Sequence, residues 1–191
     1  MKLVFATANK NKLIEIQQLI PSTIQLLNLT DINCIEDIPE TQSTIEGNAS
    51  QKAFYVYEKY HFNCFADDTG LEVEVLNGKP GVLSARYAGK NKNANDNMNK
   101  ILAEMQGITN RKARFKTIIS LVIDGKEIHF EGVVNGVILA EKRGNKGFGY
   151  DPIFMPDQEL RSFAEMELSE KNRISHRAIA VNKLVKHLQN L

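Results

Sequence analysis

Cysteine is scarce in this sequence of 191 residues, which contains only Cys34 and Cys64. No second cysteine pair and no Cys/His cluster accompanies them, so a zinc site cannot be completed and we expect two buried free thiols. Long apolar runs are also missing, because no stretch approaches the ~20 residues of a membrane helix. Met1 leads straight into residues 2–6, which are too few for the core of a signal peptide. These absences predict a protein of the reducing cytoplasm.

Charge of one sign is not in excess, because 24 lysines and arginines face 23 aspartates and glutamates, for a net charge of +1. The chain therefore lacks the positive field with which sequence-independent nucleic-acid binders displace counterions, and long DNA or RNA is a poor candidate substrate. Small anions stay compatible, because a few lysines in a cleft bind a triphosphate at any net charge. Hydrophobic residues at 42% and charged residues at 25% argue against disorder and against a fibrous protein.

The length suits one catalytic domain, or a domain with a small lobe, and no repeat or linker divides residues 1–191. Hydrophobic periodicity predicts strands alternating with helices from the N-terminus onward. Predicted strands lie at 2–6, within 24–29 and at 64–66. Predicted helices are one between an N-cap at Asn9 and a stop at Pro21, and one within 45–60. This order favours an α/β sheet with helices packed on it.

The rest of the chain is predicted to make the sheet mixed. Two apolar-rich runs, 113–124 and 126–139, meet around Asp124-Gly125 as a hairpin. Residues 77–93 form a long polar connection, a length that is often functional. Residues 71–75 are predicted to alternate between buried and exposed. An asparagine-rich stretch at 91–99 is predicted to run into a helix whose inward residues are Met98, Ile101, Leu102 and Met105. A loop is predicted at 144–156, and a terminal helix from Ser175.

A candidate anion site lies where the first strand passes into the first helix, at Thr7-Ala8-Asn9-Lys10-Asn11-Lys12. Backbone N–H groups and the positive end of the helix dipole point into such a turn. Asn9 and Lys12 would add side-chain donors. A capping asparagine beside a surface lysine is the alternative interpretation.

Asp67 and Asp68 are expected at the carboxyl end of a buried strand, the edge at which open α/β sheets bind ligands. Because neighbouring strand residues point in opposite directions, only one of them is expected to enter a cleft. Mg²⁺ takes carboxylate oxygens and bridges them to phosphates, so an aspartate here with a separate glutamate is a candidate metal site. The alternative is that these acids cap a turn.

Phe148-Gly149-Tyr150-Asp151 places two aromatic rings and a carboxylate in a glycine-rich loop, where a ring can stack on a base and a carboxylate can accept a ring N–H. A packed loop anchor is the alternative. Lys171 and the pair His176-Arg177 flank the start of the last helix.

Together these segments closely resemble the inosine triphosphate pyrophosphatase family, particularly its bacterial dITP/XTP pyrophosphatases, along nearly the whole chain. Four ordered blocks carry the resemblance: FATANKNK at 5–12, ADDTGLEVEVLNGKPGVLSARYAG at 66–89, GFGYDPIF at 147–154 and SFAEMELSEKNRISHR at 162–177. Ser162 stands where many relatives have threonine, a conservative difference.

The resemblance implies an elongated α/β fold with a mixed β-sheet flanked by helices, two lobes around a central cleft, and a homodimer. It also implies a Mg²⁺-dependent hydrolysis of ITP, dITP or XTP between the α and β phosphates. Asp68 would then be the catalytic acid/base and a metal ligand, with Glu40 as second ligand, although Glu36 or Glu46 could replace Glu40. Residues 7–12 and Lys52 would hold phosphate, and Thr69 would contact substrate. Phe148–Asp151, His176 and Arg177 would meet the base, and Lys171 would lie along the nucleotide. With a purine as the base, we hypothesise that Phe148 stacks on it while Asp151 and Arg177 contact its edge.

Two other interpretations compete with this one. A nucleotide-binding module without chemistry would keep the pocket, but the intact Asp68, Glu40 and Lys52 argue against it. A pyrophosphatase for pyrimidine or methylated nucleotides on a related fold is the rival within the enzymes. Lys12 and Lys52 are expected to be exposed lysines that serve phosphate more than stability.

Overall fold

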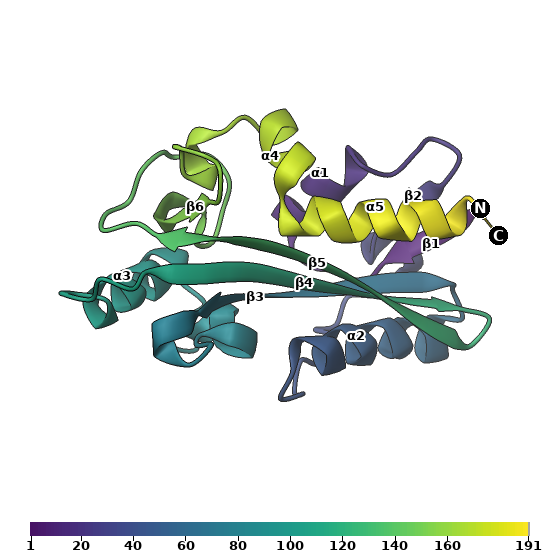
Figure 1. Ribbon diagram of the computed structural model, residues 1–191. Helices are drawn as coiled ribbons and strands as arrows, with labels where there is room; N and C mark the ends of the chain where they lie inside the picture. Colours follow the sequence, from purple (N-terminus) through teal and green to yellow (C-terminus); the bar gives the residue numbers. More distant parts are fainter. Residues whose placement is uncertain (191) are drawn as a thin grey trace. The chain divides into compact units, whose positions relative to one another are not determined.

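The computed structural model describes residues 1–190 and has the α/β architecture that the sequence predicts (Figure 1). Its strands are β1 (Lys2–Phe5), β2 (Gln25–Leu27), β3 (Cys64–Val73), β4 (Lys112–Ile123), β5 (Lys126–Ile138) and β6 (Phe154–Pro156). Its α-helices are α1 (Lys10–Gln17), α2 (Ile45–Tyr60), α3 (Ala94–Glu104), α4 (Leu168–Ile174) and α5 (His176–Leu188). Short 3₁₀ turns cover Thr30–Ile32, Glu74–Leu76, Gly81–Arg86, Asp151–Ile153 and Phe163–Glu165.

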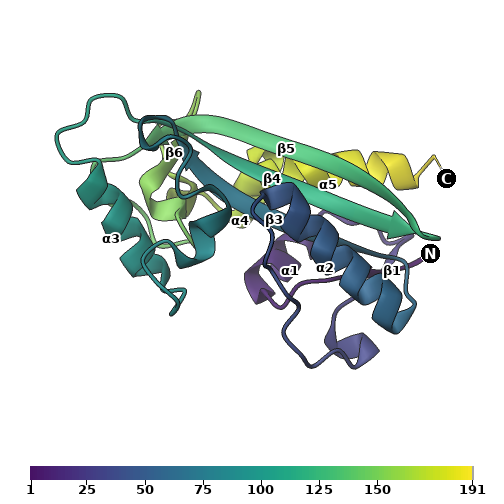
Figure 2. The ribbon, with the colours of Figure 1, turned by 90° about the horizontal axis from the view of Figure 1, so that it is seen from below.

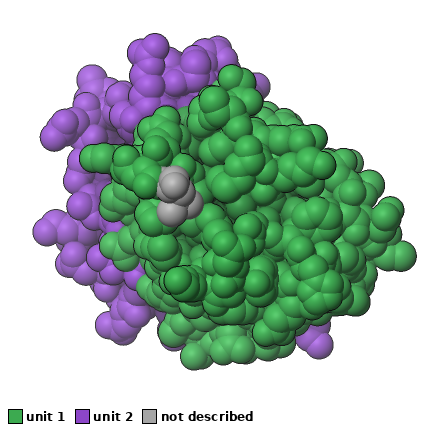
Figure 3. Space-filling model, turned by 90° about the vertical axis from the view of Figure 1, so that its right-hand side faces the viewer, with its two compact units in different colours: residues 1–68, 117–132, 176–191 green, residues 69–116, 133–175 purple. Residues whose placement is uncertain are grey.

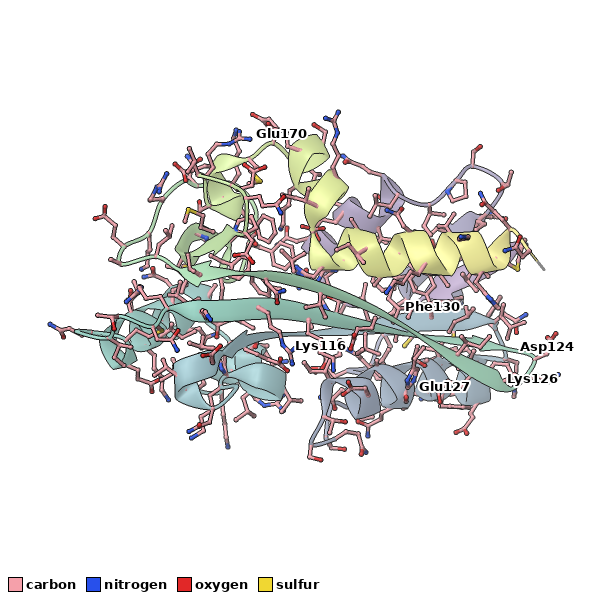
Figure 4. All side chains as sticks on the ribbon, viewed as in Figure 1. Lys116, Asp124, Lys126, Glu127, Phe130 and Glu170 are labelled. Carbon is pink, nitrogen blue, oxygen red and sulfur yellow. The ribbon has the colours of Figure 1, made fainter. Side chains whose placement is uncertain are left out.

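The strands form one mixed sheet in the order β2-β1-β3-β4-β5-β6. β1 pairs in parallel with β2 and with β3, with Val4 opposite Leu27 on one side and Cys64 on the other. β6 pairs antiparallel with β5. The hairpin between β4 and β5 turns at Asp124 and Gly125, whose φ angles of 48° and 76° are the positive pair that a type I′ turn requires. The mixed sheet and this hairpin confirm the sequence prediction, and Figure 4 labels Asp124 and Lys126 at the turn.

Contacts along the chain divide it into two compact units, coloured separately in Figure 3. Unit 1 comprises residues 1–68, 117–132 and 176–191, and unit 2 comprises residues 69–116 and 133–175. The chain passes between the units within β3, β4 and β5, and again between Ser175 and His176. Each unit has its own hydrophobic core.

Unit 1 has helices on both faces of its strands (Figures 1 and 2). Alternate side chains of β1 and β3 serve different faces, as strand geometry dictates. Leu3, Phe5 and Phe65 pack with residues of α5, whereas Val4, Ala6, Cys64 and Ala66 pack with Ala53 and Val56 of α2. The rings of Phe5 and Phe65 stack with centroids 4.7 Å apart. Cys34 and Cys64 are buried free thiols, as the sequence predicts.

Unit 2 has a core in which the aromatic rings of Phe115, Phe154 and Phe163 meet. The Phe115 and Phe154 rings pack edge to face with centroids 4.7 Å apart. From α3, Met98 and Ile101 are buried in this core, and Met105, just after the helix, joins them. Their burial confirms the predicted inward face of that helix.

The structure corrects three sequence predictions. The strand that begins at Cys64 does not end at Ala66 but runs to Val73, so both aspartates lie within β3. The polar connection at 77–93 is not a plain loop, because it contains the 3₁₀ turn Gly81–Arg86, in which Ser84 is buried. The segment 144–156 ends in strand β6, which periodicity could not indicate because the strand has only three residues.

Candidate active site

Asp67 and Asp68 are neighbours in β3 whose carboxylates serve opposite faces of unit 1. Asp67 accepts from Lys12 Nζ at 2.9 Å and from Arg177 Nε at 3.1 Å, which come from α1 and α5. Asp68 instead accepts from Lys52 Nζ at 3.3 Å, which comes from α2. The alternation of strand side chains causes this division. It gives the two acids different surroundings and therefore different chemistry.

The Asp67 carboxylate is a buried anion held between two cations. Burial by itself would raise the pKa of Asp67, but the nearby charges of Lys12, Arg177 and Lys52 outweigh it and hold the pKa well below its usual range. Desolvation lowers the pKa of Lys12, against which the Asp67 charge acts. Such a cluster is stable only while each charge keeps its partner.

Arg177 is almost fully buried at the start of α5 and connects Asp67 to α1. Its Nη1 donates to Glu15 Oε2, while its Nε donates to Asp67. Desolvation disfavours the guanidinium, but Glu15 and Asp67 outweigh it and raise the pKa of Arg177. The start of α5 lies directly on β5, because a Cβ added to Gly132 would stand 2.0 Å from the carbonyl oxygen of His176. His176, the residue before Arg177, is buried as well.

Asp68 and Glu40 share one lysine. Lys52 Nζ lies 2.6 Å from Glu40 Oε1 and 3.3 Å from Asp68 Oδ1. Asn48, one helical turn before Lys52 on α2, directs its Nδ2 to Asp68 Oδ2 at 3.4 Å. Desolvation raises the pKa of Asp68, opposed by Lys52 and Lys12 and assisted by Glu40 and Asp67. A carboxyl group with a raised pKa suits proton transfer near neutral pH.

Two carboxylates on one cation are a donor set that fits a hard divalent metal. Mg²⁺ is commonly held by one or two carboxylates, and water and substrate phosphate complete its octahedron. The Lys52 ammonium already shows that Asp68 and Glu40 can converge on a single positive charge. Within residues 1–190, no group of three or more His, Cys, Asp or Glu side chains could hold a metal by itself. The fit is therefore to a metal shared with phosphate rather than to a closed structural site.

The predicted anion segment forms the N-terminus of α1, with Asn9 as its cap. The Asn9 Oδ1 accepts from the N–H groups of Asn11 and Lys12 at 3.0 and 3.2 Å, which confirms the predicted cap. These two N–H groups thus already have a side-chain acceptor. Lys12 extends its ammonium to Asp67, and its side chain is 13% exposed.

Unit 2 carries a second group of predicted site residues. Asp151 Oδ2 accepts from the Phe148 N–H at 2.8 Å and from Lys171 Nζ at 2.6 Å. The Lys171 ammonium lies 4.9 Å from the centroid of the Phe148 ring and 5.6 Å from that of Phe163. Tyr150 donates its hydroxyl to the carbonyl of Ser84 at 2.7 Å. These contacts match the loop-anchor interpretation of Asp151 and Tyr150.

Several sequence expectations about the site need correction or completion. Lys12 and Lys52 are not exposed lysines, because both are buried or nearly so between carboxylates. Of the three glutamates considered, Glu40 meets Lys52 beside Asp68, whereas Glu36 binds Tyr55, Lys59 and Tyr60. Sequence reasoning missed Asn48 and Glu15. Asn48 stands four residues before Lys52, a spacing that would have placed both on one helix face.

A search against protein-family models matches residues 3–187 to the Ham1 family. The chain belongs to the Ham1 family. A relative from Flavobacterium psychrophilum, named dITP/XTP pyrophosphatase, is 57% identical over 190 residues that cover 100% of both chains. Another with the same name, from Flavobacterium johnsoniae, is 57% identical over 97% of this chain and 96% of its own.

Solved Ham1 structures have the same fold. The HAM1 protein of Coxiella burnetii superposes with a TM-score of 0.92 at 36% identity, covering 100% of both chains. The Ham1 protein of Staphylococcus aureus gives 0.90 at 36% identity, covering 100% of this chain and 99% of that one. The resemblance drawn from four sequence blocks and the expected α/β fold are confirmed.

Proposed function

We propose that this Ham1 protein hydrolyses deaminated purine nucleoside triphosphates (ITP, dITP and XTP) to the monophosphate and pyrophosphate. Relatives that are 57% identical over nearly all of both chains bear the name dITP/XTP pyrophosphatase. The observation that carries the chemistry is the convergence of Asp68 and Glu40 on Lys52. Two carboxylates that converge on one cation fit a divalent metal shared with phosphate, which the hydrolysis needs.

In the proposed reaction, water attacks the α-phosphorus and the bond from that phosphorus to the α–β bridging oxygen breaks, so that pyrophosphate leaves. Asp68 and Glu40 would hold Mg²⁺, which would supply positive charge that neutralises the phosphate oxygens. A carboxylate oxygen of Asp68 accepts the proton of the attacking water.

The lysines provide charge rather than covalent catalysis. Phosphoryl transfer depends mainly on positioning and electrostatic stabilisation, which suits a site without a serine or cysteine nucleophile. Lys52 stands next to both carboxylates, and Lys12 stands at the N-terminus of α1. We assign both to the phosphates, together with residues Thr7 to Asn11.

The base is assigned to the loop that carries Phe148, with Thr69, Gly149, Tyr150 and Lys171 along the nucleotide. Phe148 is partly exposed, so its ring can receive a purine. Asp151 is 2% exposed, and its contacts to Phe148 and Lys171 suggest that it holds this loop. His176 and Arg177 remain assigned to the base as proposals, although the ion pairs of Arg177 also give it a structural part.

Three further proposals accompany the activity: Mg²⁺ as the metal, a homodimer, and action in the cytoplasm. Buried free Cys34 and Cys64 support a reducing compartment. Within residues 1–190 no helix is long and apolar enough to cross a membrane.

The test is pyrophosphate release from ITP, XTP, dUTP and GTP, with and without Mg²⁺. The proposal expects ITP and XTP to be hydrolysed with Mg²⁺ and GTP to be a poor substrate. Preference for dUTP would instead support the pyrimidine pyrophosphatase, and no release from any of the four would support the binding module.

A further inference from the structure

The segment 36–42, which carries Glu40, lies along α2 in the opposite direction to the helix. Its contacts run in reverse order: Glu36 meets Tyr60, Glu40 meets Lys52, and Gln42 meets Asn48. Thr41 makes a two-way contact with Gln51, because its N–H donates to Gln51 Oε1 and its hydroxyl accepts from Gln51 Nε2, both at 2.9 Å. Contacts at both ends of the segment and between them therefore fix its register on α2.

Glu36 is the far anchor of the segment. Its Oε1 accepts from Tyr55 Oη at 3.0 Å, from Tyr60 Oη at 2.5 Å and from Lys59 Nζ. Hydrogen bonds from Lys59 first and Tyr60 second hold the pKa of Glu36 at about 2. The acceptor is therefore ionised at neutral pH, and charge-assisted hydrogen bonds of this kind are the strong ones.

Asn48 ties the near end of the segment to Asp68. The Gln42 N–H can only donate, so the atom that it meets at 2.9 Å must be the oxygen of the Asn48 amide. The amide nitrogen then faces Asp68 Oδ2 at 3.4 Å. Asn48 is 2% exposed, so its orientation is set by these partners rather than by solvent.

The first turn of α2 is built to let the segment approach closely. A Cβ added to Gly47 would lie 2.8 Å from Gln42 Cβ, a distance that real contacts do not reach. The nearest atom sits next to the backbone of Gln42 and cannot swing away as the end of a long side chain could. A residue larger than glycine at this position must therefore displace the segment.

From these contacts we infer that Glu36 and Asn48 are positioning residues that set Glu40 beside Asp68 by fixing the register of segment 36–42 on α2. The inference rests on the proposed function only in that Glu40 and Asp68 serve a metal and phosphate there. Residues that orient metal ligands change metal affinity or activity by about 10- to 100-fold when removed. Glu36 touches neither Asp68 nor Lys52, so any effect of its removal on the site must pass through the segment.

A matched control exists in the same unit. Glu127, labelled in Figure 4, is a carboxylate on β5 whose Oε1 accepts from Ser120 Oγ at 2.7 Å and lies 2.9 Å from His129 Nε2. Like Glu36 it is about one-third exposed, with 28% of its side chain accessible against 30% for Glu36. It also hydrogen-bonds Ser50 of α2, but it makes no contact with segment 36–42 among those described for residues 1–190.

The experiment compares wild type, Glu36→Gln, Tyr60→Phe and the control Glu127→Gln by two measurements. Hydrogen–deuterium exchange followed by mass spectrometry reports peptides covering 36–44, where the N–H groups of Thr41 and Gln42 are hydrogen-bonded to α2. This readout needs neither metal nor substrate. Mg²⁺ titration of pyrophosphate release from ITP gives the half-saturating Mg²⁺ concentration and the kcat at saturating metal.

We expect both Glu36→Gln and Tyr60→Phe to accelerate exchange in 36–44 but not in β4, since only the local opening becomes easier. The half-saturating Mg²⁺ concentration should rise by about tenfold with kcat changed less than about twofold, and Glu127→Gln should match wild type. Unchanged exchange in 36–44, or faster exchange everywhere, would overturn the inference. Local acceleration with an unchanged Mg²⁺ requirement would also overturn it. A wild type that needs no Mg²⁺ would refute the proposed metal, while the exchange result would still decide whether Glu36 holds the segment.

Discussion

Asp67 and Asp68 are adjacent in β3, yet Asp67 pairs with Lys12 and Arg177 while Asp68 pairs with Lys52. The two carboxylates therefore have different roles, one structural and one proposed to be functional. Asp67 neutralises two buried cations and is part of what holds α1 and α5 to the sheet. We propose that Asp68, together with Glu40, binds a metal and phosphate instead. Substitution of each by asparagine separates stability from activity.

We predict that Asp67→Asn destabilises the fold, because the buried Arg177 and the largely buried Lys12 lose their shared counter-charge. Removing one partner of a buried ion pair costs about 3–5 kcal/mol. Urea unfolding followed by circular dichroism measures the loss. Asp68→Asn serves as the control and should lose clearly less stability than Asp67→Asn, because Lys52 keeps Glu40 as its counter-charge. Equal stability of the two variants would contradict this division of roles.

A second prediction compares two glycines of the Phe148 loop. Gly147 and Gly149 both have positive φ, 69° and 66°, so alanine is strained at either position by about 1–2 kcal/mol. Only at Gly147 would a Cβ collide with a partner, 2.1 Å from Asp151 Oδ2.

Gly147→Ala should therefore displace the Asp151 carboxylate from the Phe148 N–H and raise the KM for ITP by about tenfold, a cost of about 1.4 kcal/mol. Gly149→Ala should cost similar backbone strain but leave the KM within about twofold, because nothing lies within 4 Å of its Cβ. Steady-state kinetics on both variants decide. Equal KM values would mean that Asp151 does not control the position of this loop.

A third prediction concerns pH and the Glu36 anchor. The pKa of Glu36 is about 2 in the folded protein against an ordinary value of 4.5, and its neighbours are Lys59, Tyr60 and Tyr55. A lowered pKa stabilises the fold above the unfolded value, and this contribution declines as pH falls toward the folded value. The stability difference between wild type and Glu36→Gln should thus be full at pH 6 and shrink between about pH 4.5 and about pH 2.

Chemical denaturation of wild type and Glu36→Gln across that range measures the difference. A constant difference would show that the Glu36 charge does not contribute. Growth of the difference at low pH would reverse the sign and contradict the assigned hydrogen bonds.

Local sequence rules predicted the parts of the site that depend on neighbours in the chain. Asn9 was recognisable as a cap because a cap bonds N–H groups two and three residues ahead. The separation of Asp67 from Asp68 followed from strand alternation, which holds wherever the strand ends. The hairpin at Asp124 and Gly125 followed from its turn residues and flanking apolar runs.

The same local rules could not predict features that depend on residues distant in the sequence. Asp67 and Asp68 looked like a strand end because acids followed by Thr69-Gly70 suit a turn, yet ladder pairing continues β3 to Val73. The burial of Lys52 depends on Glu40 and Asp68, which reach it from a loop and a strand. Glu40 rather than Glu36 lies beside Lys52 because of how segment 36–42 runs along α2. No periodicity in the sequence encodes that arrangement.

The central claim is that Asp68 and Glu40 form the metal-dependent centre of an ITP pyrophosphatase. Its most direct test measures IMP and pyrophosphate together, by ion-exchange chromatography, after incubation of ITP with Mg²⁺ and either wild type or Asp68→Asn. We predict equal amounts of IMP and pyrophosphate from wild type, no IDP, and a loss of at least about 10³-fold in kcat for Asp68→Asn, comparable to the loss of a main electrostatic element of a catalytic site. Formation of IDP and inorganic phosphate, or near-normal turnover by a folded Asp68→Asn protein at saturating Mg²⁺, would contradict the account.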